Sequence, residues 1–387
     1  MTDAATQSAD LEMLDRAARA GMRGLGMVEP NPPVGCVIGR RRPEGSVEIF
    51  AVGHHRRVGG PHAEIDALGA CRLSGRDPAG ATVWVTLEPC AHLGRTPSCA
   101  EALIEAGVAE VVYAAPDPHP QAAGGAGRLR AAGVRARECQ VSASALALCE
   151  PFIHRMRTGR PWVIAKWAQT LDGRVAARTG ESQWISGRRA RLDVHRLRAR
   201  VDAVITGAGT VRADDPMLTA RSVRRVRRRA LRIIVDPDLT TPFTSRLMRT
   251  IEEAPVMLWC RTAAHALRAA EHEHRGAVVL ALPEHEGRLD LRAGLETICT
   301  ERGVSTALVE AGPGLTGDLA DRDLIDEVRA YIAPRALADG AAFPIMRGRR
   351  ARALGEAAAF RLMVLRRLGP DALLVWRRTR EDRPVSL

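Results

Sequence analysis

The pattern of hydrophobic and polar positions changes its period repeatedly along the first part of the chain. Apolar side chains spaced three and four residues apart predict a helix over 10–24. Pro61 suits the first turn of a helix that reaches about Arg72, and another helix is predicted over 98–106. Runs of β-branched residues bounded by turn-forming residues predict strands at 33–39, 47–53, 81–89 and 110–116. Residues 131–138 begin the last small structural unit of this half.

The same alternation starts again at residue 162. Strands are predicted at 162–169, 202–207, 231–236, 255–260, 277–282, 305–310 and 327–333, with helices between several of them, as at 187–200. Residues 361–378 predict a strand pair that turns near Gly369 and Pro370, and 157–161 predicts a linker. Alternating strands and helices are typical of α/β folds, so we expect two such domains, at 1–155 and 156–387.

Composition narrows the class of protein. The 387 residues are 46% hydrophobic but only 3% aromatic, which indicates cores filled by aliphatic side chains. The sequence contains no apolar run of about 18 residues and no apolar secretory segment near residue 1. Its eight cysteines are scattered, unlike a disulfide framework. We therefore expect a cytoplasmic protein without a membrane partner.

The net charge of +12 raises the question of a nucleic-acid partner. Seven arginines of this basic excess lie in one run, residues 221–232, which has no interleaved aromatic residues. Such a run is typical of a solvated loop rather than of a site that stacks bases. We therefore expect no nucleic-acid partner.

Lys166 is the only lysine, and the other 56 of the 57 basic residues are arginine. Arginine cannot reproduce the compact ammonium of lysine or its tunable proton. Lys166 is therefore either a residue that could not be exchanged or one that survives by chance, and its position alone does not separate the two.

Three residues in two short segments have the types and spacing of a zinc site. His62 lies in "PHAEIDAL", and Cys90 and Cys99 lie in "EPCAHLGRTPSC". Catalytic zinc commonly has three protein ligands and one solvent position, so we expect one Zn²⁺ per chain. Glu64, two residues after His62, suits a general acid and base. The alternatives are a closed site with His92 as a fourth ligand, or unrelated core cysteines.

The spacing of the cysteines separates this site from the best-known zinc deaminases of bases. In their signature, H-x-E followed by P-C-x-x-C, two residues lie between the cysteines. Here eight residues lie between Cys90 and Cys99, which argues against a cytidine or tRNA-adenosine deaminase.

With "PNPPVGCVI", "PHAEIDAL" and "VTLEPCAHLGRTPSC", the first half resembles the deaminase half of the bifunctional riboflavin-biosynthesis deaminase–reductase family. The resemblance implies a cytidine-deaminase-like three-layer domain in which zinc hydroxide attacks C2 of 2,5-diamino-6-(5-phosphoribosylamino)pyrimidin-4-one and ammonia leaves. It also implies that Asn31 contacts the pyrimidine, although the residue could equally cap a turn before Pro32. The segment "DPHPQAAGGAG" departs from the family pattern, as do Ala91 and Ser98. These departures concern the binding of the base or the phosphate and not the zinc chemistry.

The second half resembles the reductase half of the same family, through "KWAQTLDGRVA", "GESQWISG", "HRLRARVDAVITGAGTVRADDPMLTAR" and "VEAGPGLTGDL". The resemblance implies a dihydrofolate-reductase-like domain that uses NADPH to reduce the ribosyl group to ribityl. The substrate contacts that it implies are Lys166, Ser182, Arg198, Leu218, Arg221 and Glu310. The implied NADPH contacts are Ala168, Trp184, Thr210, Asp214, Gly312, Pro313, Gly314, Leu315, Thr316, Gly317 and Asp318.

Physical readings of these residues agree with the resemblance. The glycine-rich turn at 312–314 can offer backbone N–H groups to a pyrophosphate, and "GAGT" at 207–210 offers a second such turn, although either could be only a tight turn. The guanidinium groups of Arg198 and Arg221 suit a sugar phosphate. We expect Lys166 to hydrogen-bond the ribose hydroxyls or to supply a proton.

The sequence therefore predicts a bifunctional enzyme that acts on a small phosphoribosyl pyrimidine, with Zn²⁺ and NADPH as cofactors, assembled as a homo-oligomer. Two alternatives stay open. One is a reductase that retains a degenerate deaminase half, and the other is a basic zinc protein that binds or edits RNA.

Overall fold

The computed structural model describes residues 3–92, 98–348 and 353–379. Its internal contacts divide the chain into two units, Met1–Gly159 and Arg160–Leu387. The division falls after the expected boundary at 155/156, because a helix continues through that point to Thr158 and ends at Gly159, whose φ is +69°. The predicted linker at 157–161 is therefore partly helical.

Within the described residues, the first unit contains a five-stranded sheet of order β2-β1-β3-β4-β5. β1 runs antiparallel to β2 and β3, whereas β3, β4 and β5 are mutually parallel. The strands are β1 (Gly35–Arg41), β2 (Val47–His54), β3 (Thr82–Val85), β4 (Glu110–Tyr113) and β5 (Arg135–Glu138). The helical elements are α1 (Asp3–Gly21), η1 (Met22–Gly24), α2 (Ala63–Leu73), α3 (Cys99–Glu105), α4 (Gly125–Ala131) and α5 (Ala143–Thr158).

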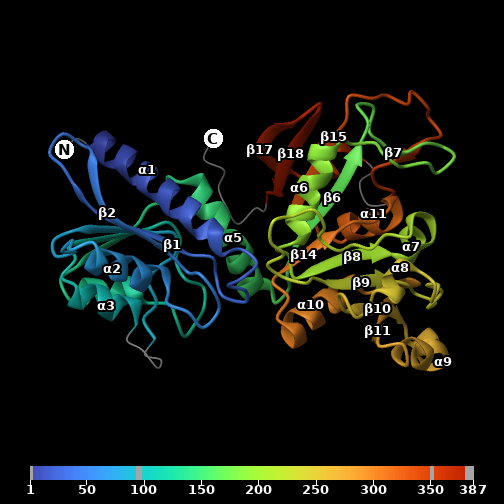
Figure 1. Cartoon of the computed structure of the whole chain (residues 1–387), viewed down its shortest axis with the longest axis horizontal. Coiled ribbons are helices and arrows are strands. Elements are labelled where there is room, and N and C mark those ends of the chain that lie inside the picture. The colour runs from blue at the N-terminus through green and yellow to red at the C-terminus, as the bar shows by residue number, and fades with distance from the viewer. Residues whose placement is uncertain (1–2, 93–97, 349–352, 380–387) are drawn as a thin grey trace. The chain divides into compact units, whose positions relative to one another are not determined.

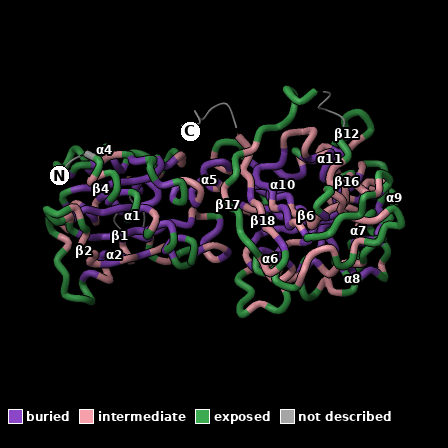
Figure 2. The backbone as a smooth tube through the Cα atoms, turned by 90° about the horizontal axis from the view of Figure 1, so that it is seen from above, coloured by how far each residue is buried: buried purple, intermediate pink, exposed green. Residues whose placement is uncertain are grey.

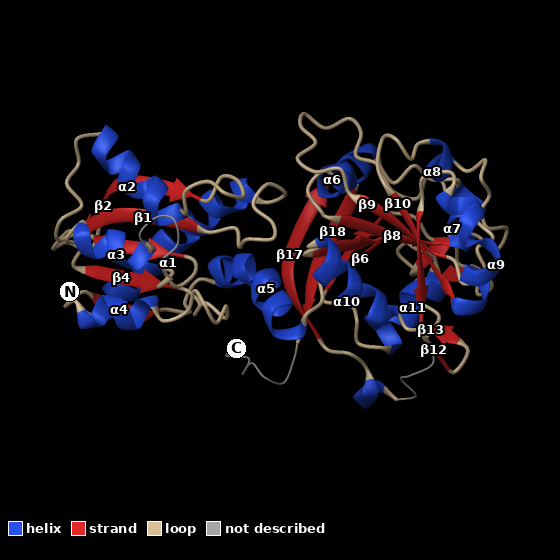
Figure 3. Cartoon of the chain, turned by 90° about the horizontal axis from the view of Figure 1, so that it is seen from below, coloured by secondary structure: helices blue, strands red, loops and turns tan. Residues whose placement is uncertain are grey.

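Helices cover both faces of this sheet (Figures 1 and 3). Leu14 of α1 and Leu148 of α5 pack with Trp84 on one face. Leu68 of α2, Leu103 of α3 and Leu129 of α4 pack in the cluster on the other face. The expected three-layer arrangement is therefore confirmed.

The second unit has, among its described residues, a nine-stranded sheet of order β11-β10-β9-β8-β14-β6-β15-β18-β17. The strands from β11 to β15 are parallel, and β18 and β17 add an antiparallel hairpin. The strands are β6 (Trp162–Gln169), β8 (Ala203–Gly207), β9 (Leu231–Val235), β10 (Val256–Arg261), β11 (Val278–Leu282), β14 (Thr306–Val309), β15 (Glu327–Ile332), β17 (Phe360–Leu368) and β18 (Asp371–Arg378). Two small ribbons pair β7 (Arg174–Ala176) with β16 (Phe343–Pro344) and β12 (Glu284–His285) with β13 (Arg288–Leu289).

Helices also cover both faces of the second sheet. They are α6 (Arg188–Arg198), α7 (Ala208–Asp214), α8 (Arg246–Arg249), α9 (Thr262–Glu273), α10 (Leu291–Arg302), α11 (Pro313–Asp321) and the turn η2 (Leu354–Glu356). Leu197 of α6 and Leu247 of α8 belong to the core cluster on one face. Leu295 of α10 and Leu319 of α11 belong to the cluster on the other face. The buried segments in Figure 2 follow these strands and the inner sides of the helices. No helix in the described part of the chain is both long and apolar enough to cross a membrane.

The arginine run at 221–232 is only partly the solvated loop that the sequence predicts. Arg224, Arg225 and Arg229 are exposed, as expected. Arg228 instead pairs with Asp202, a buried carboxylate that also accepts the backbone N–H groups of Ser305 and Thr306, at 2.9 Å each.

Arg232, at the end of the run, is fully buried in β9. Its guanidinium donates to the carbonyls of Met217 and Thr250 at 3.1 and 2.8 Å, and also to that of Ala254. The expectation of a solvated residue is wrong here, because main-chain carbonyls accept from both Nη atoms, although Nε has no partner among the described residues.

These contacts predict that the exposed and the buried arginines of residues 221–232 contribute differently to the free energy of unfolding. Replacing Arg224, Arg225 and Arg229 together with serine should leave the free energy of unfolding nearly unchanged. Arg232→Met should lower that free energy by about 3 kcal/mol, because several buried carbonyls lose their donor. Denaturant unfolding followed by tryptophan fluorescence measures both. An equal loss in the two proteins would contradict this division of the run.

Candidate functional site

A cavity of about 480 Å³ lies in the first unit, where the parallel strands β3 and β4 end. This volume is typical of a pocket for a small molecule. Its wall contains the predicted metal ligands His62 and Cys90, the predicted acid and base Glu64, and Asn31. It also contains residues that the sequence analysis did not select, namely His55, Glu88, Asp117, Phe152, Arg155 and Met156.

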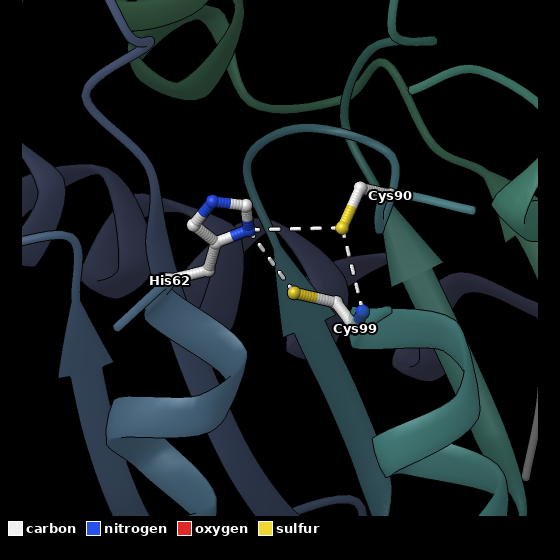
Figure 4. A group of neighbouring side chains, drawn as sticks. All are labelled: His62, Cys90 and Cys99. Carbon is white, nitrogen blue, oxygen red and sulfur yellow. Dashed lines mark hydrogen bonds between the residues drawn. The ribbon is translucent and has the colours of Figure 1, made fainter. Parts of the chain in front are cut away.

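The three predicted zinc ligands meet at this edge of the sheet (Figure 4). His62 is the N-cap residue of α2, Cys99 is the first residue of α3, and Cys90 follows β3. His62 Nδ1 lies 3.3 Å from Cys99 Sγ and 3.7 Å from Cys90 Sγ. The backbone N–H of Cys99 also donates to Cys90 Sγ, at 3.3 Å.

This geometry fits a tetrahedral zinc ion. Zinc bonds of about 2.0 Å to nitrogen and 2.3 Å to sulfur, at a tetrahedral angle, separate the two donor atoms by about 3.5 Å. The two observed nitrogen–sulfur distances, 3.3 and 3.7 Å, lie on either side of that value. Among the described residues, the group that could hold a metal contains no ligand beyond His62, Cys90 and Cys99, so the closed site with His92 is not favoured.

The two cysteines influence one another's ionisation. The hydrogen bond from Cys99 lowers the pKa of the Cys90 thiol, against the effect of burial. The same contact and burial raise the pKa of the Cys99 thiol, because a second thiolate beside the first is unfavourable. A cation between them would let both ionise, which is the state that binds zinc.

Glu64 stands in the first turn of α2 and is only 3% exposed. Burial raises the pKa of its carboxyl to about 7, and the neighbouring His62 partly opposes this shift. A group with a pKa near neutrality can both accept and donate a proton at cellular pH. Glu64 therefore combines position and proton affinity for acid–base work beside the metal ligands.

The unusual segment "DPHPQAAGGAG" forms another wall of the cavity. Glu88 fixes this wall, since its carboxylate accepts the backbone N–H of Asp117 at 3.2 Å and that of Ala126 at 2.9 Å. Gly125 lies so close to the segment before Cys90 that an added Cβ would stand 1.7 Å from the Pro89 carbonyl oxygen. The sequence departures therefore leave the wall in place, with His119 lining the cavity.

Asn31 lines the same cavity beside a histidine. Its side-chain nitrogen lies 3.4 Å from His55 Nε2, and His55 Nδ1 lies 2.9 Å from the Pro61 carbonyl oxygen. His55 thereby connects Asn31 to the segment that leads into His62. The signal for His55 was its position at the end of a predicted strand, just before the zinc motif.

In the second unit, three of the predicted substrate contacts come together. Glu310 follows β14, the strand between β8 and β6. Its carboxylate accepts from Arg198 at 2.5 and 2.9 Å and lies 3.5 Å from Lys166 Nζ. Burial alone would raise the pKa of Glu310, but Arg198 and Lys166 outweigh it and hold the pKa at about 2.

The pKa of Lys166 is also lowered, but here burial is the cause and not the opposing effect. Burial lowers the pKa of its ammonium, and Glu310 partly offsets that effect. Its Nζ also lies 5.9 Å from the centre of the Tyr331 ring.

The two glycine-rich turns of the second unit lie side by side. The backbone N–H of Gly312 donates to Thr210 Oγ1 at 3.2 Å. Leu315, in the first turn of α11, lies near Gly207, where an added Cβ would stand 3.7 Å from its side chain. Ser182 donates to Asp214, the last residue of α7, at 3.2 Å. The turns predicted to meet a nucleotide thus adjoin one another.

Other predicted contacts have different surroundings. Asp318 pairs with Arg288 and Arg322, at 2.8 and 2.9 Å, while Thr316 and Gly317 are buried. The other two residues at the start of α11 are Pro313, which is partly buried, and Gly314, which is exposed. Ala168 lies in β6 beside the cluster of α6 and β18.

Three more of the predicted contacts differ in exposure. Trp184 is 61% exposed and stacks against Arg191. Leu218 is buried in a left-handed backbone conformation with φ +54°. Arg221 is exposed, and partial burial and the positive charge of Arg198 lower its pKa.

Two family models match the chain, one in each unit. Residues 7–115 match the model described as the cytidine and deoxycytidylate deaminase zinc-binding region. Residues 161–374 match the model described as the RibD C-terminal domain.

Individual proteins match nearly the whole chain. The riboflavin biosynthesis protein RibD of Escherichia coli (strain K12) is 39% identical over 373 residues, which cover 93% of this chain and 96% of that protein. The protein of the same name from Aquifex aeolicus (strain VF5) is 35% identical over 370 residues, or 95% of this chain and 98% of that protein.

Two solved structures are similar over the same extent. Acinetobacter baumannii RibD, form 1, is 35% identical with a TM-score of 0.79 and covers 97% of this chain and 100% of its own. A diaminohydroxyphosphoribosylaminopyrimidine deaminase/5-amino-6-(5-phosphoribosylamino)uracil reductase from Thermotoga maritima is 31% identical with a TM-score of 0.80. The match covers 96% of this chain and 99% of that one.

The position of Glu64 beside the ligand group, and not within it, predicts separate effects on metal content. Glu64→Gln should keep about one zinc per chain, whereas His62→Ala and Cys99→Ser should lose most of it, because a three-ligand site tolerates no missing ligand. Elemental analysis of the purified proteins measures this. Loss of zinc from Glu64→Gln would make Glu64 a ligand and remove its role as a free acid and base.

Proposed function

The chain belongs to the RibD family and is a bifunctional deaminase and reductase of riboflavin biosynthesis, and from this premise we propose how its residues divide the two reactions. Zinc and NADPH are the cofactors of the two halves. The first unit would deaminate 2,5-diamino-6-(5-phosphoribosylamino)pyrimidin-4-one. The second would reduce the ribosyl group of the product and yield 5-amino-6-(5-phosphoribitylamino)uracil. The observation that carries this division is the meeting of His62, Cys90 and Cys99 beside a buried Glu64.

For the deaminase half, we propose that Glu64 moves protons while the neighbouring side chains hold the ring. Zinc held by His62, Cys90 and Cys99 would lower the pKa of its water, so that nucleophilic hydroxide can form near neutral pH. Glu64 would take up the proton that this water loses and deliver one to the departing 2-amino group, so that ammonia leaves and a carbonyl forms at C2. Asn31, which lines the same cavity and contacts His55, would orient the pyrimidine.

For the reductase half, Glu310 and Lys166 would position the opened ribose. NADPH supplies the hydride for C1′. Because Glu310 stays ionised, its carboxylate can accept from ribose hydroxyls, and the Lys166 ammonium can donate to one of them or supply a proton. Arg198 and Arg221, whose positive charges influence one another, would hold the phosphate, with Ser182 and Leu218 completing the substrate contacts.

We propose that NADPH binds where the two glycine-rich turns adjoin. The backbone N–H groups at the start of α11, from Gly312 to Leu315, and those near Thr210 suit its pyrophosphate. The remaining proposed contacts are Ala168, Trp184, Asp214, Thr316, Gly317 and Asp318. Because Arg288 and Arg322 already engage the Asp318 carboxylate, that residue would act mainly by fixing the turn.

Neither alternative function is favoured. A degenerate deaminase half would not need to keep three metal ligands and Glu64 in one cavity. An RNA-binding role would use the arginine run, yet Arg228 and Arg232 of that run are engaged inside the second unit.

We propose two further properties. A homo-oligomer is supported by the edge strand β17, on which Leu362 and Leu365 are 51% and 69% exposed. A cytoplasmic location is supported by the eight cysteines, all of which are described, buried and free.

Separate assays of the two reactions test the division of labour. Given the diaminopyrimidine substrate, zinc and NADPH, the protein should release ammonia and then oxidise NADPH. Glu64→Gln should lower ammonia release by at least about a hundredfold, since it removes the proton carrier. NADPH oxidation on the deaminated intermediate should stay at the parental rate. Parallel loss of both rates would indicate misfolding and not loss of one site.

Lys166→Arg should have the converse effect. The planar guanidinium cannot occupy the place of the compact ammonium beside Glu310, and a displacement of about 1 Å in an aligned site can lower a rate about a hundredfold. We expect such a loss in NADPH oxidation, with ammonia release unchanged. Parental NADPH oxidation would mean that this lone lysine survives by chance.

A further inference from the structure

The deaminase cavity has an unbalanced set of charges. Zinc held by two thiolates and a neutral imidazole carries no net charge, because the thiolates cancel the two charges of the ion. Three carboxylates, those of Glu64, Glu88 and Asp117, line the cavity. A phosphorylated substrate would add further negative charge, so a cation is needed where its phosphate binds.

Arg155 is the one arginine or lysine among the described residues that line this cavity. It lies in the last turn of α5, where Phe152 and Met156 of the same helix add apolar side chains to the wall. Within the described residues, the cavity therefore brings one guanidinium into the same space as a neutral zinc centre.

The guanidinium of Arg155 is only partly used by the protein. Its Nη1 atom donates to the Pro30 carbonyl oxygen at 3.0 Å. Its Nε is buried and has no hydrogen-bond partner within the described part of the chain. A guanidinium has five N–H donors in a fork that matches a phosphate. Nε is enclosed by protein atoms, but Nη2 makes no hydrogen bond within the described residues, so its donors remain for a ligand.

We propose that Arg155 binds the 5′-phosphate of the pyrimidine substrate in the deaminase cavity. The proposal rests on the deaminase function and adds the residue that selects a phosphorylated substrate over its free riboside. Arg155 acts on substrate binding and not on proton transfer, because the phosphate is remote from the carbon that loses its amino group.

Arg155 could instead have only a structural role. Its bond to Pro30 supports the segment that presents Asn31 to the cavity. Loss of that support would disturb recognition of the ring, and the ring is common to the phosphorylated substrate and the riboside. The two roles therefore differ in whether the phosphate matters.

The test compares deamination of the phosphorylated substrate and of its riboside, obtained by phosphatase treatment. Arg155→Gln should raise KM for the phosphorylated substrate about 10- to 100-fold, the range for a lost charged hydrogen bond, with kcat little changed. Its KM for the riboside should equal that of the parent, and this turnover also shows that the variant is folded. Arg157→Gln, an exposed position on the same helix, serves as the matched control and should leave both KM values unchanged.

Equal rises of KM on both substrates, or no rise on either, would overturn the proposal. If Arg155→Gln does not fold, Arg155→Lys replaces it and should show a severalfold rise confined to the phosphorylated substrate, since an ammonium cannot grip two phosphate oxygens in parallel. Failure of the parent protein to release ammonia from either substrate would instead refute the deaminase function itself.

Discussion

Parallel strands bring their carboxyl ends to one edge of a sheet, and both candidate sites of this protein depend on that constraint. In the first unit, Cys90 follows β3 and Asp117 follows β4, so the two loops face one cavity. In the second unit, β14 lies between β8 and β6, which brings Glu310 beside Lys166 and the Gly312 turn beside Thr210. Residues far apart in the chain become neighbours because their strands end together.

Two buried glutamates show how the surroundings of one residue type set its role. At Glu64, burial outweighs the opposing charge of His62 and raises the pKa to about 7, so the carboxyl is able to carry a proton. Glu310 is nearly as enclosed, with 9% of its side chain exposed, but Arg198 and Lys166 hold its pKa at about 2 and keep it ionised. The first is suited to acid–base catalysis and the second to holding hydroxyl groups and a cation in place.

The wide spacing of the two cysteines is compatible with zinc because neither position depends on the number of residues between them. Cys90 is set by the end of β3, and Cys99 by the start of α3, where the preceding Ser98 caps the helix by accepting the Glu101 N–H. The N–H of Cys99 then donates to Cys90 Sγ and sets the approach of the two sulfurs. The eight-residue gap departs from the P-C-x-x-C signature without changing the ligand set, and residues 7–115 still match the cytidine and deoxycytidylate deaminase zinc-binding region.

The sequence by itself determined the two α/β halves, the positions of most sheet strands and the zinc group, because hydrophobic period and residue spacing are local properties. It did not predict α5 as a helix, since Pro151 inside that segment lowers helix propensity and the packing of Phe152 and Ile153 compensates for it. As a result the expected boundary at 155/156 separates Arg155 from Met156, which line the same cavity. Only the tertiary structure decided which arginines are solvated and which are enclosed, because the acceptors for Arg232 and Arg228 come from segments distant in the chain. Whether each arginine is solvated or holds the core together therefore depends on its burial and its hydrogen-bond partners, and not on its residue type.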